Sequence, residues 1–405
     1  MMIKTPRVFR HPNYRLFFYG QLVSLMGTWM QAVALGWLVY RLTHSPFLLG
    51  VVSFAQQGPI FFLSPLGGAI ADRRDRRSVF IVTQSLAMLF AAVLTVLTLT
   101  GAVTVGMVMA LALASGIVTA VETPTRQSFT IEMVGREDLK QAIAFNAMMF
   151  NVARTVGPAL GGILVAAVGE GFCFLLNTFS YAAVLAGLVS MRLQSQPPRS
   201  PSHPWDDLKQ GFSYVVHHAE IRTALTLSAL TGFFGMSFLA LLPAYARDVL
   251  GQGSDALGFV MSGFGVGAFL GAAAASRLHE RQLAYVSTLA AAVLGVSLAL
   301  FANVHTLTFA IAFVFPAGLS YLMLAVSNNT RMQTLTDDAM RGRVMSFYAM
   351  GALGCAPLGA LLQGLIANRF GVPAALTLGG AFCIAAATIS YISLRQQGIL
   401  GGIPD

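Results

Sequence analysis

The stretch Gly68-Ala-Ile-Ala-Asp72-Arg73-Arg74-Asp75-Arg76-Arg77 stands at the junction of two long apolar runs. One run covers residues 47–71 and the next covers residues 79–99, so four arginines lie where one apolar segment gives way to another. A helix needs about 20 mostly apolar residues to cross the hydrocarbon core of a bilayer. The pattern therefore predicts two membrane-spanning helices joined by a short basic turn.

The same alternation of apolar runs and short polar joints continues along the whole chain. Its 405 residues are 56% hydrophobic and only 10% charged, with a mean hydropathy of +0.70, whereas soluble domains carry about 25% charged residues. Twelve spans are predicted, at residues 14–40, 47–71, 79–99, 103–121, 141–168, 172–191, 223–245, 256–276, 284–302, 307–327, 344–367 and 373–394. We expect an all-α polytopic membrane protein with twelve transmembrane helices.

Basic side chains are confined almost entirely to alternate joints. Of the 25 Lys and Arg residues, only Arg41, Arg154, Arg247 and Arg369 lie elsewhere. Basic residues accumulate on the cytoplasmic side of a membrane, so we expect a multi-pass protein of the bacterial inner membrane with both termini in the cytoplasm. The same asymmetry explains the net charge of +9 without a nucleic-acid partner.

The two halves of the chain repeat each other. A shift of 208 positions places Leu49-Gly50 on Leu257-Gly258 and Asp72-Arg73 on Glu280-Arg281. We expect two pseudo-symmetric six-helix bundles, residues 1–191 and 223–405, joined by a proline-containing cytoplasmic linker with an amphipathic helix, residues 192–222. Duplicated halves of this kind build a pathway at their interface in many secondary transporters.

The stretch at residues 68–77 resembles the cytoplasmic signature of the major facilitator superfamily, Gly-x-x-x-Asp-Arg-x-x-Arg-Arg, with Asp75 in place of the usual glycine. The resemblance implies that Asp72 accepts backbone N–H groups at the start of span eleven and that Arg73 needs a nearby anion, for which Glu122 is the candidate. It assigns gating roles to Gly68, Asp72, Arg73, Arg76, Arg77 and Glu122. The alternative is that the arginines only enforce topology.

A second stretch, Gly157-Pro158-Ala159-Leu160-Gly161-Gly162 in span five, is similar to the core of the family's antiporter motif, which goes with export. Two upstream glycines of that motif are Ala144 and Ala153 here. We expect Gly157, Pro158, Gly161 and Gly162 to bend the helix and admit a close neighbour from the other half. Plain packing is the alternative.

Residues in the first span and before spans five and eleven are similar to the enterobactin-exporter and macrolide-efflux branch of the superfamily. They are Asn13-Tyr14-Arg15-Leu16-Phe17, Gly27-Thr28-Trp29-Met30-Gln31, Arg126-Gln127 and Arg341-Gly342-Arg343-Val344. This resemblance favours export and does not identify the substrate.

Arg154 is predicted deep within span five. An arginine at mid-bilayer costs about 2.5–3.5 kcal/mol on insertion scales, so it must face a cavity or a partner. Asn151 lies one turn before it, and spans one and two carry Gln31 and Gln57. We expect Gln31, Gln57, Asn151 and Arg154 to line a substrate cavity. Alternatively, helix carbonyls satisfy the guanidinium of Arg154.

The chain contains no phosphate-binding loop, metal-ligand cluster or Ser/His/Asp grouping, so we expect no enzyme activity, cofactor or metal. We expect a monomer that exports a small amphipathic compound, such as a siderophore, macrolide or other drug, by alternating access with proton coupling. Asp72, Glu122 and Glu132 are the candidate protonation sites. The alternatives are a carrier for uptake, lysolipids or metabolites, and a polytopic membrane enzyme or non-transporting sensor.

Overall fold

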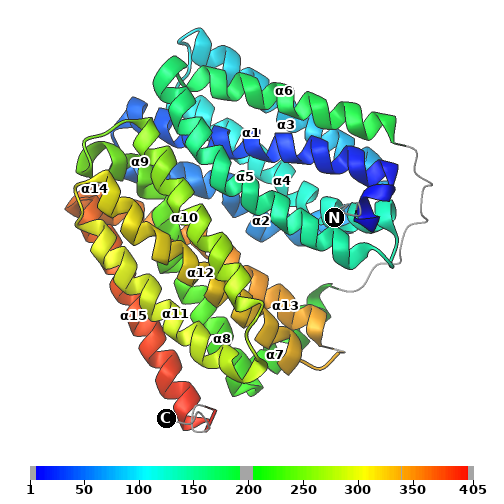
Figure 1. The fold of residues 1–405 in the computed structure, drawn as a ribbon, viewed down its shortest axis with the longest axis vertical. Helices are drawn as coiled ribbons and strands as arrows, with labels where there is room; N and C mark the ends of the chain where they lie inside the picture. Colours follow the sequence, from blue (N-terminus) through cyan, green and yellow to red (C-terminus); the bar gives the residue numbers. More distant parts are fainter. Residues whose placement is uncertain (1–5, 192–203, 339, 400–405) are drawn as a thin grey trace, which may run out of the picture. The chain divides into compact units, whose positions relative to one another are not determined.

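The computed structural model describes residues 6–191, 204–338 and 340–399, and within them the side chains of all but residues 64–73, 204–208 and 353. This part of the chain is helical and contains no strand (Figure 1). Twelve of its helices are long and apolar enough to cross a membrane. The prediction of an all-α fold with twelve spans is confirmed.

The first six spans are single helices. They are α1 (Pro12–Thr43), α2 (Pro46–Arg73), α3 (Arg76–Leu99), α4 (Val105–Val134), α5 (Leu139–Val168) and α6 (Glu170–Ser190), preceded by a short 3-10 helix, η1 (Arg7–Arg10). Helix α1 packs against α5 and α6, and α3 packs against α4 and α6. In Figure 1 α1, α3 and α6 run side by side.

The last six spans include two that are built from several pieces. One covers Ala219–Val249 and consists of α8 (Ala219–Leu230), η2 (Thr231–Met236), η3 (Ser237–Leu241), α9 (Leu242–Ala244) and η4 (Tyr245–Val249); the other covers Arg341–Phe370 and consists of α13 (Arg341–Ala349), η5 (Met350–Gly354) and α14 (Ala356–Phe370). The continuous spans are α10 (Ser254–Ala275), α11 (Glu280–Ala302), α12 (Leu307–Leu335) and α15 (Val372–Gln396).

Three of the irregular segments, η2, η4 and η5, are wide π turns. Gly232 in η2 approaches η5 so closely that a Cβ there would lie 2.6 Å from the carbonyl oxygen of Ala352. Single π turns within membrane helices interrupt the regular ladder of backbone bonds and often mark functional positions.

A further helix, α7 (Pro204–His217), forms in the linker. Its described residues pack against α13: the Phe212 and Phe347 rings have centroids 6.2 Å apart, and Arg343 donates to the side chain of Gln210 at 2.7 Å. The amphipathic helix expected in the linker is therefore present. Its position at the membrane surface stays a prediction.

Several helices continue past their expected ends. Helix α4 runs on through Glu122, Pro124 and Arg126 to Val134, and α12 runs on through Arg331 to Leu335. The expected ends at residues 121 and 327 are wrong, because the polar residues that follow them continue the helix and do not form joints. A 30-residue helix is about 45 Å long and outreaches a hydrocarbon core of about 30 Å, so these polar side chains lie on rigid helices.

The chain forms two compact units. One consists of residues 1–43, 55–201 and 253–258, and the other of residues 44–54, 202–252 and 259–405. Each unit is thus mostly one half of the sequence together with a short segment from the other half. The expected division into bundles of residues 1–191 and 223–405 stays a prediction.

The two exchanged segments contain the repeated Leu-Gly pairs. In one unit Gly50 touches the Ala360 carbonyl, and in the other Gly258 touches the Pro158 carbonyl and lies with its Cβ position 3.0 Å from Cα of Gly162. A side chain at either glycine would collide with a backbone. The sequence repeat therefore marks two equivalent close contacts between helices.

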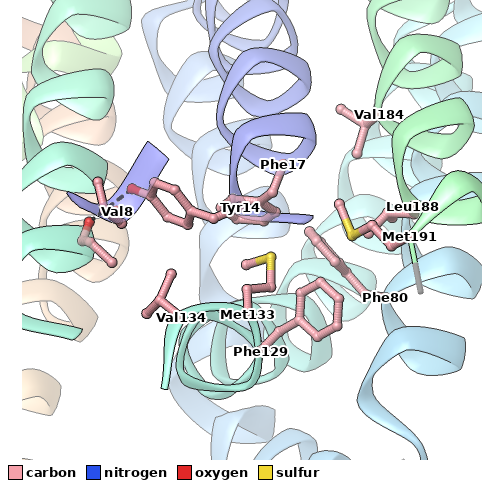
Figure 2. Close-up of a cluster of buried hydrophobic side chains, with 11 residues drawn as sticks. Val8, Tyr14, Phe17, Phe80, Phe129, Met133, Val134, Val184, Leu188 and Met191 are labelled. Carbon is pink, nitrogen blue, oxygen red and sulfur yellow. Dashed lines mark hydrogen bonds between the residues drawn. The ribbon is translucent and has the colours of Figure 1, made fainter. Parts of the chain in front are cut away.

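At one end of the first unit, aromatic and aliphatic side chains from six elements pack together (Figure 2). Phe17 of α1, Phe80 of α3 and Phe129 of α4 form a ring cluster with centroids 5.8 to 6.3 Å apart. Leu188 and Met191 bring in the end of α6, and Val8 brings in η1. This cluster fixes the helix ends that carry the basic signature residues.

Candidate functional site

The signature stretch at residues 68–77 is described in part. Nothing is described of the contacts of Gly68 or of the side chains of Asp72 and Arg73, so the roles expected of these residues stay predictions. Asp75 is the N-cap of α3: its carboxylate accepts the backbone N–H of Ser78 at 2.9 Å. A capping residue at this position is useful in its own right, which explains why aspartate can stand where the family signature has glycine.

Arg76 and Arg77 bind partners within the first unit. Arg76 donates to the carboxylate of Glu132 in α4 at 2.6 Å. The guanidinium of Arg77 donates to the Leu188 and Val189 carbonyls at 2.9 and 2.8 Å. Arg77 thereby satisfies carbonyls in the last turn of α6, where the helix dipole favours a cation. Sequence reasoning missed the Arg76–Glu132 pair, because its members are 56 residues apart.

Glu122 lies within α4, and its ion-pair partner is Arg126 of the same helix, with 3.9 Å between Oε1 and Nη1. The Glu122 side chain is 14% exposed and that of Arg126 is 29% exposed. Pro124 lies between them and supplies no N–H to the helix. The expected pairing of Glu122 with Arg73 falls on a side chain outside the described residues.

Polar side chains of α6 and α1 lie near this region. Tyr181 of α6 comes one turn after Asn177, and the charges of Glu122 and Arg126 act on it. The fully buried Asn177 donates to Gln31 Oε1 at 2.7 Å and accepts from Ser180 at 2.9 Å. Gln31 therefore belongs to a network built around Asn177, which the sequence did not reveal.

Arg154 is buried in α5, with only 8% of the residue exposed. Its Nη2 donates to Oδ1 of Asn151 at 2.8 Å, and the amide of Asn151 donates to the Ala147 carbonyl at 2.8 Å. The structure thus brings Arg154 and Asn151 together, as their spacing predicted. Gln57 of α2 is exposed. The assignment of these residues to a substrate cavity stays a prediction.

The glycines that follow Arg154 place α5 directly against other helices. A Cβ at Gly157 would lie 2.6 Å from Cβ of Trp29, and one at Gly161 would lie 2.8 Å from Cα of Met30. Gly162 faces the start of α10, where Ser254 donates to its carbonyl at 3.2 Å. Pro158 lies in the middle of this contact surface. The stretch has the close packing that its small residues predict.

The second unit holds a tight ion pair that the sequence analysis did not identify. Arg331 of α12 donates to Glu220 of α8 at 2.9 Å, with the side chains 3% and 31% exposed. Asn328, one turn earlier and fully buried, donates to the Ser228 hydroxyl at 2.9 Å. The sequence does contain a signal that draws attention to Arg331: Thr330-Arg331 repeats Thr125-Arg126 at a shift of 205 positions.

The geometry is that of a polytopic helical protein with polar networks inside each unit. A search of the described residues finds no group of His, Cys, Asp or Glu able to hold a metal ion. The free thiols Cys173 and Cys383 are buried in α6 and α15.

Comparison with known proteins gives the family. The model of a family described as transmembrane secretion effector matches residues 5–398. The staphyloferrin A transporter of Staphylococcus aureus is 28% identical over 392 residues, which cover 94% of this chain and 96% of that protein. The enterobactin exporter EntS of Shigella flexneri is 24% identical over 371 residues, which cover 91% and 88% of the two chains.

Solved transporter structures share the fold. A bacterial homologue of the human lysosomal transporter Spinster, in an inward-facing and unoccupied conformation, has a TM-score of 0.75 at 13% identity and covers 96% of this chain and 98% of its own. A transporter of the POT family in complex with 5-aminolevulinic acid has a TM-score of 0.76 at 13% identity, with 99% and 98% covered.

These relatives are transporters, and the alternative of a polytopic membrane enzyme or a sensor is set aside. The twelve spans make the chain a multi-pass membrane protein, and its family and relatives are transporters of small molecules, not enzymes. The match along nearly its full length means that the chain belongs to the transmembrane secretion effector family of the major facilitator superfamily.

Proposed function

We propose that this protein is a secondary active exporter of a siderophore or a similar amphipathic compound. It works as a monomer by alternating access in the bacterial inner membrane, with both termini in the cytoplasm, and uses the inward movement of protons. The description of the family as secretion effectors and the name of the enterobactin exporter among its relatives support export. The distribution of Lys and Arg supports the orientation.

The observation that carries the proposal is the buried Arg154–Asn151 pair in α5. A guanidinium inside a membrane helix is costly unless it serves a partner or a ligand. Siderophores carry many oxygen atoms that accept hydrogen bonds, and a planar guanidinium matches paired oxygens well. In our proposal Arg154 and Asn151 bind these oxygens, and Gln31 and Gln57 add weaker polar contacts.

The gate of the proposed exporter uses the two motifs. Gly68, Asp72 and Arg73 act with Arg76 and Arg77 at the cytoplasmic end, where Arg76 is tied to α4 and Arg77 to the end of α6. The glycines of α5 act as a sliding surface: Gly161 and Gly162 face the backbone of neighbouring helices, and Gly157 faces the Cβ of Trp29. Pro158 supplies the bend.

Uptake of iron-free enterobactin and staphyloferrin A into inside-out membrane vesicles tests this proposal. Movement into the lumen corresponds to export, and a protonophore distinguishes coupled from passive movement. We expect accumulation of at least one compound and its loss with the protonophore. Accumulation by right-side-out vesicles instead would favour the alternative, an uptake carrier, and movement of neither compound in either orientation would contradict the proposal.

Arg154→Ala is expected to lower the uptake at least tenfold while the protein still inserts and stays folded. Arg247→Ala is the matched control, because Arg247 is an exposed arginine outside the proposed cavity. Equal uptake by both variants would remove Arg154 from the substrate site, and loss of folded protein in Arg154→Ala would assign it a structural role.

A further inference from the structure

In the described part of the chain, the carboxylate of Glu122 combines burial with weak compensation for its charge. It lies within a continuous membrane-spanning helix with its side chain 14% exposed. An ionised carboxylate in such a place loses most of its hydration and depends on compensation from neighbouring groups. The neutral, protonated form needs far less compensation. The setting therefore leaves both protonation states accessible to Glu122.

The compensation available from Arg126 is loose. The 3.9 Å separation contrasts with the 2.6 Å between Glu132, also of α4, and Arg76 of α3. Arg126 is on the same helix, four residues after Glu122. Coulomb attraction falls with distance, and Arg126 retains access to solvent at 29% exposure. The pair can open without breaking a contact between helices.

The polar network beside Glu122 gives its charge a route to other helices. Among the described residues, the titratable or charged groups that act on this region are Arg126 from α4 and Tyr181 from α6. Tyr181 lies one turn after Asn177 on α6, and Asn177 donates to Gln31 of α1 at 2.7 Å. A change of charge at Glu122 therefore acts beside the turn of α6 that is hydrogen-bonded to α1.

We propose that Glu122 is the residue that carries the coupling proton, with Arg126 as its counter-charge and the hydrogen-bonded pair Asn177–Gln31 on α6 and α1 as the element that senses its charge. This inference rests on the proposed exporter function. In one half of the cycle a proton from the outside forms an O–H bond with a carboxylate oxygen of Glu122, and in the other half that bond breaks and the proton leaves to the cytoplasm.

Antiport requires that the proton and the substrate occupy the protein in turn. An ionised carboxylate accepts hydrogen bonds on both oxygens, whereas a protonated one presents a donor at one of them. Hydroxyl and amide N–H groups of a siderophore can bind the ionised form of Glu122 and not the protonated form to the same extent. Substrate binding from the cytoplasm therefore displaces the proton, as export demands.

Proton release on substrate binding tests the proposal directly. The purified full-length protein in detergent, in weakly buffered solution with a pH-sensitive dye, is mixed with iron-free enterobactin or staphyloferrin A. The wild type is expected to release about one proton for each molecule bound, and Glu122→Gln is expected to release almost none. Glu137→Gln, a change at an exposed glutamate between α4 and α5, is expected to match the wild type.

The outcomes separate the two proposals. If the wild type neither binds nor transports the two compounds, the exporter function fails, and this inference fails with it. If the wild type transports with proton coupling and Glu122→Gln still releases a proton, only the assignment of Glu122 is overturned. If Glu122→Gln no longer binds, Glu122→Asp decides: the displaced carboxyl is expected to shift the pH range of release, and an unchanged range overturns the assignment.

Discussion

Arg126 and Arg331 each follow a threonine in the fourth span of their half of the sequence, yet their ion pairs differ. Arg126 has a partner on its own helix at 3.9 Å, while Arg331 reaches across to α8 at 2.9 Å. In the first pair the carboxylate is the more buried member, and in the second the arginine is, with 3% of its side chain exposed. The difference suggests two uses of one repeated feature: a pair that can change its charge and a pair that clamps two helices.

The largest expected effect is on proton coupling, and it distinguishes the carboxylate of Glu122 from that of Glu220. Glu122→Gln is expected to lower the stimulation of uptake by a pH gradient at least tenfold, because the amide cannot take up a proton. Glu220→Gln is expected to keep that stimulation within about twofold of the wild type. Both are measured in inside-out vesicles with and without an imposed gradient. Equal losses in the two variants would erase the proposed distinction.

The next largest effect is on stability, and here the Arg331–Glu220 pair is expected to matter more than the Arg126–Glu122 pair. Arg331→Met leaves Glu220 without its partner and removes a buried guanidinium, so we expect a loss of about 3 kcal/mol, at the lower end for buried pairs because Glu220 is partly exposed. Labelling of the buried thiols on heating measures this loss, in a Cys355→Ser background. We expect Cys383 in the second unit to become labelled at a lower temperature than Cys173 in the first unit. Simultaneous labelling of both would contradict a local clamp.

The network around Asn177 is expected to make an intermediate contribution to stability. Asn177→Ala removes the donor to Gln31 and the acceptor for Ser180, and an unmet buried polar group costs about 1–3 kcal/mol. We expect earlier thermal labelling at Cys173, together with a reduced response of uptake to pH. An unaltered pH response in Asn177→Ala would show that the network does not respond to the charge of Glu122.

The smallest effect on stability is expected from Arg126→Met. Pairs with a partly exposed member four residues apart on one helix contribute about 0.5 kcal/mol, so labelling of Cys173 on heating should stay close to that of the wild type. Its proton release should nevertheless change, because the counter-charge of Glu122 is gone. A stability loss as large as that of Arg331→Met would show that the two pairs are alike.

Much of the fold could be read from the sequence because the membrane imposes simple rules. Apolar runs of helical length gave the twelve spans, and the repeated Leu-Gly pairs mark the close contacts made by Gly50 and Gly258. The spacing of Asn151 and Arg154 predicted that they share a helix face, and the structure joins them by a hydrogen bond.

The partners of the charged residues could not be read in the same way. Arg76 with Glu132 and Arg331 with Glu220 are pairs between helices that are distant in sequence, and no local pattern specifies which helices meet. The ends of α4 and α12 were misplaced for a related reason: Glu122, Pro124 and Arg126 have the composition of a joint, and only packing against neighbouring helices keeps them helical.

Proton movement driven by substrate in inside-out vesicles tests the central claim most directly. Respiration acidifies the lumen, and a quenched pH-sensitive dye reports the gradient. If the protein exchanges a lumenal proton for its substrate, adding iron-free enterobactin or staphyloferrin A to wild-type vesicles restores the fluorescence, and adding it to Glu122→Gln vesicles does not. Uptake of the compound with no recovery of fluorescence in wild-type vesicles would contradict proton-coupled export.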